Sequence, residues 1–100
     1  MTDPFAEMRS RLDGALQVYV STFCWDCRRL KGFLEEHKVP FSQVNISEDD
    51  DAAQRLMAET GKRGVPYILV NDKHWVRGYH REARGKFDPG LLIQELAQAL

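Results

Sequence analysis

Cys24 and Cys27 are the only cysteines of this 100-residue chain, and their spacing forms a C-x-x-C pair. The apolar run Leu16–Val20 precedes the pair, and a helical pattern follows it. Two thiols at this spacing can close a disulfide or bind a metal ion. Their position between a strand and a helix favours thiol–disulfide exchange.

The expected helix gives the two cysteines different roles. Its unpaired backbone N–H groups would point at the sulfur of Cys24, which lies just before it. A helix N-terminus lowers the pKa of a cysteine thiol, so Cys24 is predicted to be the attacking thiolate. Cys27 lies about one turn further along on the same side. It should be more buried, and it is predicted to resolve the mixed disulfide and release the product.

The charges around the pair run partly against the helix dipole. Arg28, Arg29 and Lys31 occupy the start of the helix, where cations are unfavourable. A need to hold a thiolate, or to meet an acidic partner, would explain them. The carboxylate of Asp26 would disfavour a neighbouring thiolate. We expect it to cap the helix, to lie exposed, or to accept a proton from Cys27.

A metal site is the alternative chemistry for the pair. A zinc site needs four ligands and one C-x-x-C supplies two, while His37, His74 and His80 show no ligand spacing. We therefore predict no mononuclear metal site and no tightly bound cofactor. An iron–sulfur carrier or sensor that uses Cys24, with the cluster shared between two chains, stays open as an alternative.

The composition indicates one ordinary globular domain. The chain is 43% hydrophobic and 29% charged with a net charge of −1, so nothing points to nucleic acid or a membrane surface. No apolar run approaches the ~18 residues of a membrane span. Residues 1–10 do not have the pattern of a signal peptide. We expect a cytoplasmic protein, in which paired cysteines are more often redox-active or metal-binding than structural.

The pattern divides the chain into residues 1–14, an N-terminal extension, and residues 15–100, the domain. The extension is expected to be disordered or to form a short helix over 4–12, packed loosely. The run Leu16–Val20 predicts the first strand. A helical period then predicts a helix from Asp26 to about Lys38.

The second half of the chain continues with alternating elements. Residues 41–46 predict a strand, and Ser47 followed by four acids predicts a helix start. Gly61 should end that helix, and its buried stripe is expected to be Ala53, Leu56, Met57 and Thr60. The remaining expected elements are a strand over 67–70, a turn at Asn71-Asp72, a strand over 74–77 ending at Gly78, a loop over 79–87 and a helix capped by Asp88-Pro89.

The element order is therefore βαβαββα. Strands separated by a helix should be parallel, with a right-handed crossover, and the final hairpin should be antiparallel. This predicts an α/β protein with a four-stranded mixed sheet and three flanking helices, a thioredoxin-like arrangement.

Several segments together resemble the glutaredoxin family over about residues 15–100. They are the C-x-x-C pair at the end of strand one, the segment Arg63-Gly64-Val65-Pro66 in place of the family's Thr-Val-Pro, and Gly78 at its glycine turn. The run from Val18 to Cys24, followed by Arg29-Leu30-Lys31, is similar to bacterial glutaredoxin-like redoxins such as the mycoredoxins. The resemblance implies a thiol–disulfide oxidoreductase acting on protein disulfides or on mixed disulfides between a protein and a small thiol.

The resemblance also implies roles for individual residues. Pro66 would be cis and face the cysteines, and the backbone of Val65 would pair with a bound thiol or peptide. Arg63 matches a position that often contacts a glutathione carboxylate, and Gly78 would allow close backbone approach. Phe23 and Trp25, which flank the first cysteine, are assigned to substrate binding.

The implied partners are protein disulfide clients and an electron donor, with the chain itself expected to be a monomer. Glutathione or another low-molecular-weight thiol is the expected co-substrate, and a protein reductase is the other candidate donor. The family's usual lysine is replaced by Ser21, and the usual acid after the glycine turn is absent from Tyr79-His80-Arg81. A thiol-dependent arsenate reductase, with Arg63 or Arg77 binding the anion, is a third alternative.

Overall fold

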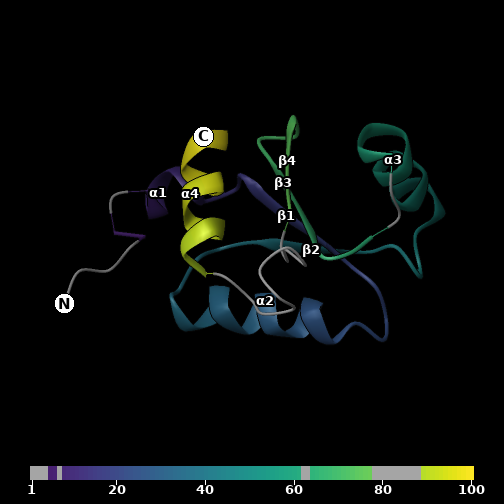
Figure 1. Ribbon diagram of the computed structural model, residues 1–100, viewed down its shortest axis with the longest axis horizontal. Helices are drawn as coiled ribbons and strands as arrows, with labels where there is room; N and C mark the ends of the chain where they lie inside the picture. Colours follow the sequence, from purple (N-terminus) through teal and green to yellow (C-terminus); the bar gives the residue numbers. More distant parts are fainter. Residues whose placement is uncertain (1–4, 7, 62–63, 78–88) are drawn as a thin grey trace.

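The computed structural model describes residues 5–6, 8–61, 64–77 and 89–100. Four strands form one mixed sheet in the order β2-β1-β3-β4, with helices on both of its faces (Figure 1). The predicted order βαβαββα is confirmed for the domain, and a short helix, α1, precedes it at the N-terminus, one of the two outcomes expected there. No helix in the described part of the chain is long and apolar enough to cross a membrane.

Strand β1 is central to the sheet. β1 (Leu16–Val20) pairs in parallel with β2 (Ser42–Asn45) and antiparallel with β3 (Tyr67–Val70). Strand β4 (His74–Arg77) pairs antiparallel with β3 and forms the second edge. The end of β1 that leads to the cysteines therefore has β2 on one side and β3 on the other.

Successive side chains of β1 point to opposite faces of the sheet, and each face has its own core. α2 (Trp25–Glu36) and α4 (Pro89–Ala99) contribute to the core on the face of Val18, and α3 (Asp50–Thr60) covers the face of Tyr19. Figure 1 shows α3 on the opposite side of the strands from α1 and α4. The larger core includes these fully buried side chains: Val18, Leu30, Leu34, Ile68, Val70, Leu92 and Leu96.

Helix α2 ends two residues earlier than predicted. Lys38 adopts a left-handed backbone with φ of 55°. The N–H of Val39 donates to the carbonyl of Leu34 at 2.9 Å, and that of Lys38 donates to Glu35 at 3.0 Å. This pair of hydrogen bonds is a Schellman motif, which satisfies carbonyls that the helix leaves unpaired. Val39 is buried against the larger core and fixes this end of the helix.

The N-terminal segment packs against the C-terminal end of α2. Its helix α1 (Arg9–Leu12) is shorter than the expected one. Phe5 and Leu12 have no exposed surface and belong to the larger core. The Phe5 ring lies 5.8 Å from that of Phe33, and Arg9 Nη2 donates to the carbonyl of His37 at 2.8 Å. These contacts are tight where the sequence indicated loose packing.

Two expectations for α3 are wrong. Asp49, not Ser47, caps the helix, because its side chain accepts a hydrogen bond from Ala52 N at 3.0 Å. Met57 is exposed, since it lies on the outer side of the helix. The predicted stop at Gly61 is confirmed by its left-handed backbone, with φ of 75°. Aspartate is as good an N-cap as serine, so the acid run contained a competing cap.

The β3–β4 turn and α3 are joined by a polar cluster. The predicted turn at Asn71-Asp72 is confirmed, and both residues have positive φ. Arg55 on α3 binds Asp72 Oδ1 at 2.8 Å and Glu59 Oε2 at 2.7 Å. Glu59 also accepts from Trp75 Nε1 at 2.9 Å, and this bond, followed by that from Arg55, holds the pKa of Glu59 below its ordinary value. Trp75 is therefore a packing residue of this face.

We expect Phe5→Ala to lower the free energy of unfolding by about 3 kcal/mol, because truncating a fully buried aromatic ring leaves a cavity. Urea denaturation monitored by circular dichroism measures the change. Arg11→Ala, in the same segment but exposed, is the matched control and should change stability by less than about 0.5 kcal/mol. Equal, small effects of both substitutions would contradict tight packing of the N-terminal segment.

Candidate functional site

The junction between β1 and α2 positions the first cysteine. Cys24 is the N-cap residue of α2, and its backbone is extended, with φ of −121° and ψ of 104°. Its carbonyl accepts the first helical hydrogen bond, from Arg28 N at 3.2 Å, and its Sγ accepts from Cys27 N at 3.0 Å. A sulfur atom therefore takes the capping position that a serine or aspartate oxygen usually occupies.

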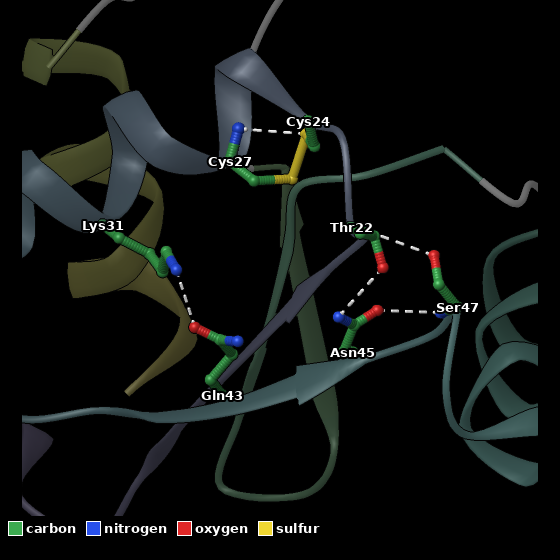
Figure 2. Close-up of a disulfide and its surroundings, with 7 residues drawn as sticks. All are labelled: Thr22, Cys24, Cys27, Lys31, Gln43, Asn45 and Ser47. Carbon is green, nitrogen blue, oxygen red and sulfur yellow. Dashed lines mark hydrogen bonds between the residues drawn. A yellow bond between two sulfur atoms is a disulfide. The ribbon is translucent and has the colours of Figure 1, made fainter.

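Cys24 and Cys27 are joined by a disulfide (Figure 2). Their Cα atoms lie 5.1 Å apart, within the range that a disulfide needs. Cys27 is only 2% exposed and is part of the larger core, whereas Cys24 is partly buried at its edge. The predicted difference in burial between the two cysteines is confirmed. An attacking group reaches the sulfur of Cys24 more easily than that of Cys27.

A hydrogen-bond network fixes the segment that leads into Cys24 (Figure 2). Thr22 N donates to Ser47 Oγ at 3.2 Å, and Asn45 Nδ2 donates to Thr22 Oγ1 at 3.4 Å. Asn45 Oδ1 in turn accepts from Ser47 N at 2.9 Å. The end of β2 thus holds the loop before the disulfide. Sequence reasoning missed this network because it assigned Ser47 to the cap of α3.

The Val65–Pro66 peptide bond is cis, which confirms the expectation for it. Tyr67, the first residue of β3, pairs with Tyr19 of β1. Because the strands are antiparallel, the residues just before Tyr67 continue beside the end of β1. Val65 and Pro66 therefore lie at the same end of the sheet as the disulfide. Val65 is half-buried and packs against both cores, and Pro66 is buried.

Two large apolar side chains beside the disulfide are open to solvent. Phe23 is 93% exposed and Trp25 is 79% exposed. The Arg28 guanidinium carbon lies 5.1 Å from the centre of the Trp25 ring, a cation–π contact. These side chains and Cys24 line a shallow cavity of about 60 Å³. Exposed aromatic residues next to a reactive group are typical of a surface that binds a partner.

The remaining predictions concern Arg63, Gly78 and Asp26. Arg63 and Gly78 lie outside the described residues, as do the expected loop over 79–87 and the Asp88 cap. Asp26 lies half-buried in the first turn of α2, but Cys24 rather than Asp26 caps the helix. The Asp26 side chain forms no hydrogen bond or ion pair with any described residue. Its role in proton transfer stays a prediction.

No cluster of three or more potential metal ligands gathers among the residues that the structure describes. Both sulfur atoms are engaged in the disulfide. Cluster binding by Cys24 would use the reduced form of the protein, and it stays a prediction.

Comparison with known sequences gives consistent matches. The family model described as Glutaredoxin matches residues 16–75. A probable glutaredoxin of Synechocystis sp. is 36% identical over 81 residues, covering 76% of this chain and 73% of its own. The glutaredoxin-like protein NrdH of Lactococcus lactis subsp. cremoris is 33% identical over 55 residues, covering 55% of this chain and 75% of its own.

Comparison with solved structures supports the same fold. A buckwheat glutaredoxin–glutathione complex superimposes with a TM-score of 0.59, covering 96% of this chain and 89% of that chain. At 20% sequence identity, this likeness establishes the thioredoxin-like arrangement alone.

Proposed function

Because the chain belongs to the glutaredoxin family and is a thiol–disulfide oxidoreductase with a Cys24–Cys27 disulfide, we propose a dithiol mechanism in which Cys24 attacks and Cys27 resolves. The observation that carries this assignment is the unequal burial of the two sulfur-bearing residues. Cys24 lies at the surface at a helix N-terminus, and Cys27 lies in the core.

The reaction starts from the reduced protein. The Cys24 thiolate attacks one sulfur of the client's disulfide, forms a mixed disulfide and releases the other client sulfur as a thiolate. The Cys27 thiolate then attacks the Cys24 sulfur, which forms the intramolecular disulfide and releases the second client thiol. Two electrons pass from the dithiol to the client, and the oxidised protein shown here is the product state.

Backbone geometry supports the choice of Cys24 as the nucleophile. In the oxidised state Cys27 N already donates to Cys24 Sγ at 3.0 Å. The same donor, together with the positive end of the helix dipole, would stabilise a negative charge on that sulfur after reduction. Cys27 lies in the first turn of α2. Because the Cα atoms of the two cysteines are 5.1 Å apart, the sulfur of Cys27 can bond to that of Cys24 without movement of the helix.

The substrate surface that we propose surrounds Cys24 on two sides. Exposed Phe23 and Trp25 would contact apolar groups of the client. Val65, which precedes the cis proline, would pair by its backbone with the peptide part of a bound thiol or protein. Proline at position 66 has no backbone N–H, so Pro66 would present no competing donor to the sulfurs. Family resemblance adds Arg63 and Gly78 to this surface.

We propose that a low-molecular-weight thiol supplies the electrons. Two thiol molecules would reduce one Cys24–Cys27 disulfide and leave as their own disulfide. The glutathione complex of the buckwheat protein makes glutathione the first candidate. Ser21 replaces the lysine that the family usually carries three residues before the first cysteine, so a different thiol is the second candidate. Both cysteines come from one chain, so a monomer can carry out the whole exchange reaction. A reducing cytoplasm would return its disulfide to the dithiol form.

Separate Cys24→Ser and Cys27→Ser variants test the division of roles. Cys24→Ser should reduce exchange with any disulfide by about a hundredfold or more, because the attacking thiolate is removed. Cys27→Ser should lose reduction of a protein disulfide but retain reduction of a mixed disulfide between a protein and glutathione. Release of free thiol, followed by absorbance, gives both rates.

Two results would contradict this mechanism. Full exchange activity of Cys24→Ser would show that the nucleophile is assigned wrongly. Unchanged reduction of protein disulfides by Cys27→Ser would show that no resolving thiol is needed. Both variants lose the Cys24–Cys27 disulfide. A difference in activity between them therefore does not come from the loss of the disulfide itself.

Side-by-side reduction of the oxidised protein by glutathione, mycothiol, or thioredoxin reductase with NADPH tests the electron donor. We expect one of the two small thiols to release the Cys24 and Cys27 thiols faster than the reductase does. Thiol titration over time gives the rates, and thioredoxin serves as the positive control for the reductase. Reduction by the reductase alone would overturn the proposed co-substrate.

A further inference from the structure

A second cavity borders the disulfide, on the side of β2. It has a volume of about 190 Å³. Its walls include the two cysteines, two cations on α2 and two amides on β2: Cys24, Cys27, Arg28, Lys31, Gln43 and Asn45. We call it the β2-side cavity. Because β1 lies between β2 and β3, this cavity and the Val65–Pro66 segment lie on opposite sides of the β1 strand end.

The β2-side cavity is rich in hydrogen-bond donors. Arg28 and Lys31 are three residues apart on α2, so they project from the same side of the helix. Lys31 Nζ donates to Gln43 Oε1 at 2.7 Å (Figure 2), which leaves two of its three N–H groups for a further acceptor. No aspartate or glutamate lines the cavity. Among the described residues, neither cation forms an ion pair.

The amides of the cavity are held in place. Gln43, which lines the cavity, has its Oε1 engaged by Lys31, so the amide N–H groups of Gln43 are its remaining hydrogen-bonding groups and act as donors. Asn45 is fixed through both ends of its amide, by Thr22 and by Ser47 (Figure 2). A pre-organised set of charged and neutral donors beside a reactive sulfur is complementary to a carboxylate.

The surroundings of the cavity favour a protein as the source of that carboxylate. Arg28 also borders the shallow cavity next to Phe23 and Trp25, whose exposed fractions are 93% and 79%. A partner that covers these side chains must extend beyond the sulfur it offers. A client can place one part of its chain on the two aromatic side chains and an adjacent side chain in the β2-side cavity.

We propose that the β2-side cavity binds the carboxylate of an aspartate or glutamate close to the reactive cysteine of a protein client. This inference rests on the proposed function, because the client must present its disulfide to Cys24. It gives Arg28 and Lys31 a role in selecting clients with acidic residues near the disulfide. The small thiol would use the opposite, Val65 side of the site.

Two peptides of the same sequence test this proposal. Each carries a cysteine in a mixed disulfide with β-mercaptoethanol, and the neighbouring residue is Glu in one and Gln in the other. With β-mercaptoethanol as the reductant, kcat/KM should be about fivefold higher for the Glu peptide than for the Gln peptide. A ratio of this size is expected from one charge-assisted hydrogen bond that solvent partly screens. The ratio should fall toward one in 0.5 M NaCl, since salt screens the attraction.

Variants of the cavity identify the binding residues. Lys31→Gln removes one cation, and Gln43→Glu places a carboxylate beside Lys31 without changing the size of the side chain. Both variants should bring the ratio between the two peptides close to one. Lys73→Gln, in the turn at the far end of the sheet, makes the same charge change as Lys31→Gln and should keep the wild-type ratio.

The outcomes separate this inference from the proposed function. Equal kcat/KM for the two peptides in the wild type would overturn the carboxylate site and leave the exchange mechanism intact. An absence of exchange with both peptides would contradict the proposed mechanism and the inference with it. If Lys31→Gln slows turnover only when glutathione replaces β-mercaptoethanol as the reductant, the carboxylate belongs to the small thiol, and the assignment to a client is overturned.

Discussion

The site depends on one local interaction, the capping of α2 by the sulfur of Cys24. The first N–H groups of any helix lack partners within the helix, and here one of them, from Cys27, points at a cysteine sulfur at 3.0 Å. This single contact places the reactive atom at the positive end of a helix dipole and brings the second cysteine within bonding reach. Exchange chemistry follows from where the strand ends and the helix begins.

Both sides of that junction are held by packing elsewhere. Thr22, just before Cys24, is tied to the end of β2 through Asn45 and Ser47. Helix α2 is fixed along its length by Leu30 and Leu34 in the larger core, and at its far end by the N-terminal segment and the Schellman motif. Rigid support of this kind keeps a capping sulfur in place, since a shift of either element would separate it from its donor.

Much of this was predictable from the sequence. The change of hydrophobic period at Asp26 and the turn at Asn71-Asp72 follow from local chemistry, and the structure confirms both. The cis Val65–Pro66 bond was expected only from the resemblance to the glutaredoxin family, and the structure confirms it as well. The cap of α3 was not predictable, because Ser47 and Asp49 are both good caps and only the tertiary partner, Thr22, occupies the serine. The β2-side cavity needed the sheet order, which brings residues from α2 and β2 together around the disulfide.

The central claim is that Cys24 is the accessible nucleophile and Cys27 the protected resolving thiol. A short pulse of iodoacetamide on the reduced, folded protein, followed by peptide mass spectrometry, tests it directly. Cys24 should carry nearly all of the label, because Cys27 is only 2% exposed, and Cys27 should react only after unfolding in urea. Preferential or equal labelling of Cys27 in the folded protein would contradict the assignment.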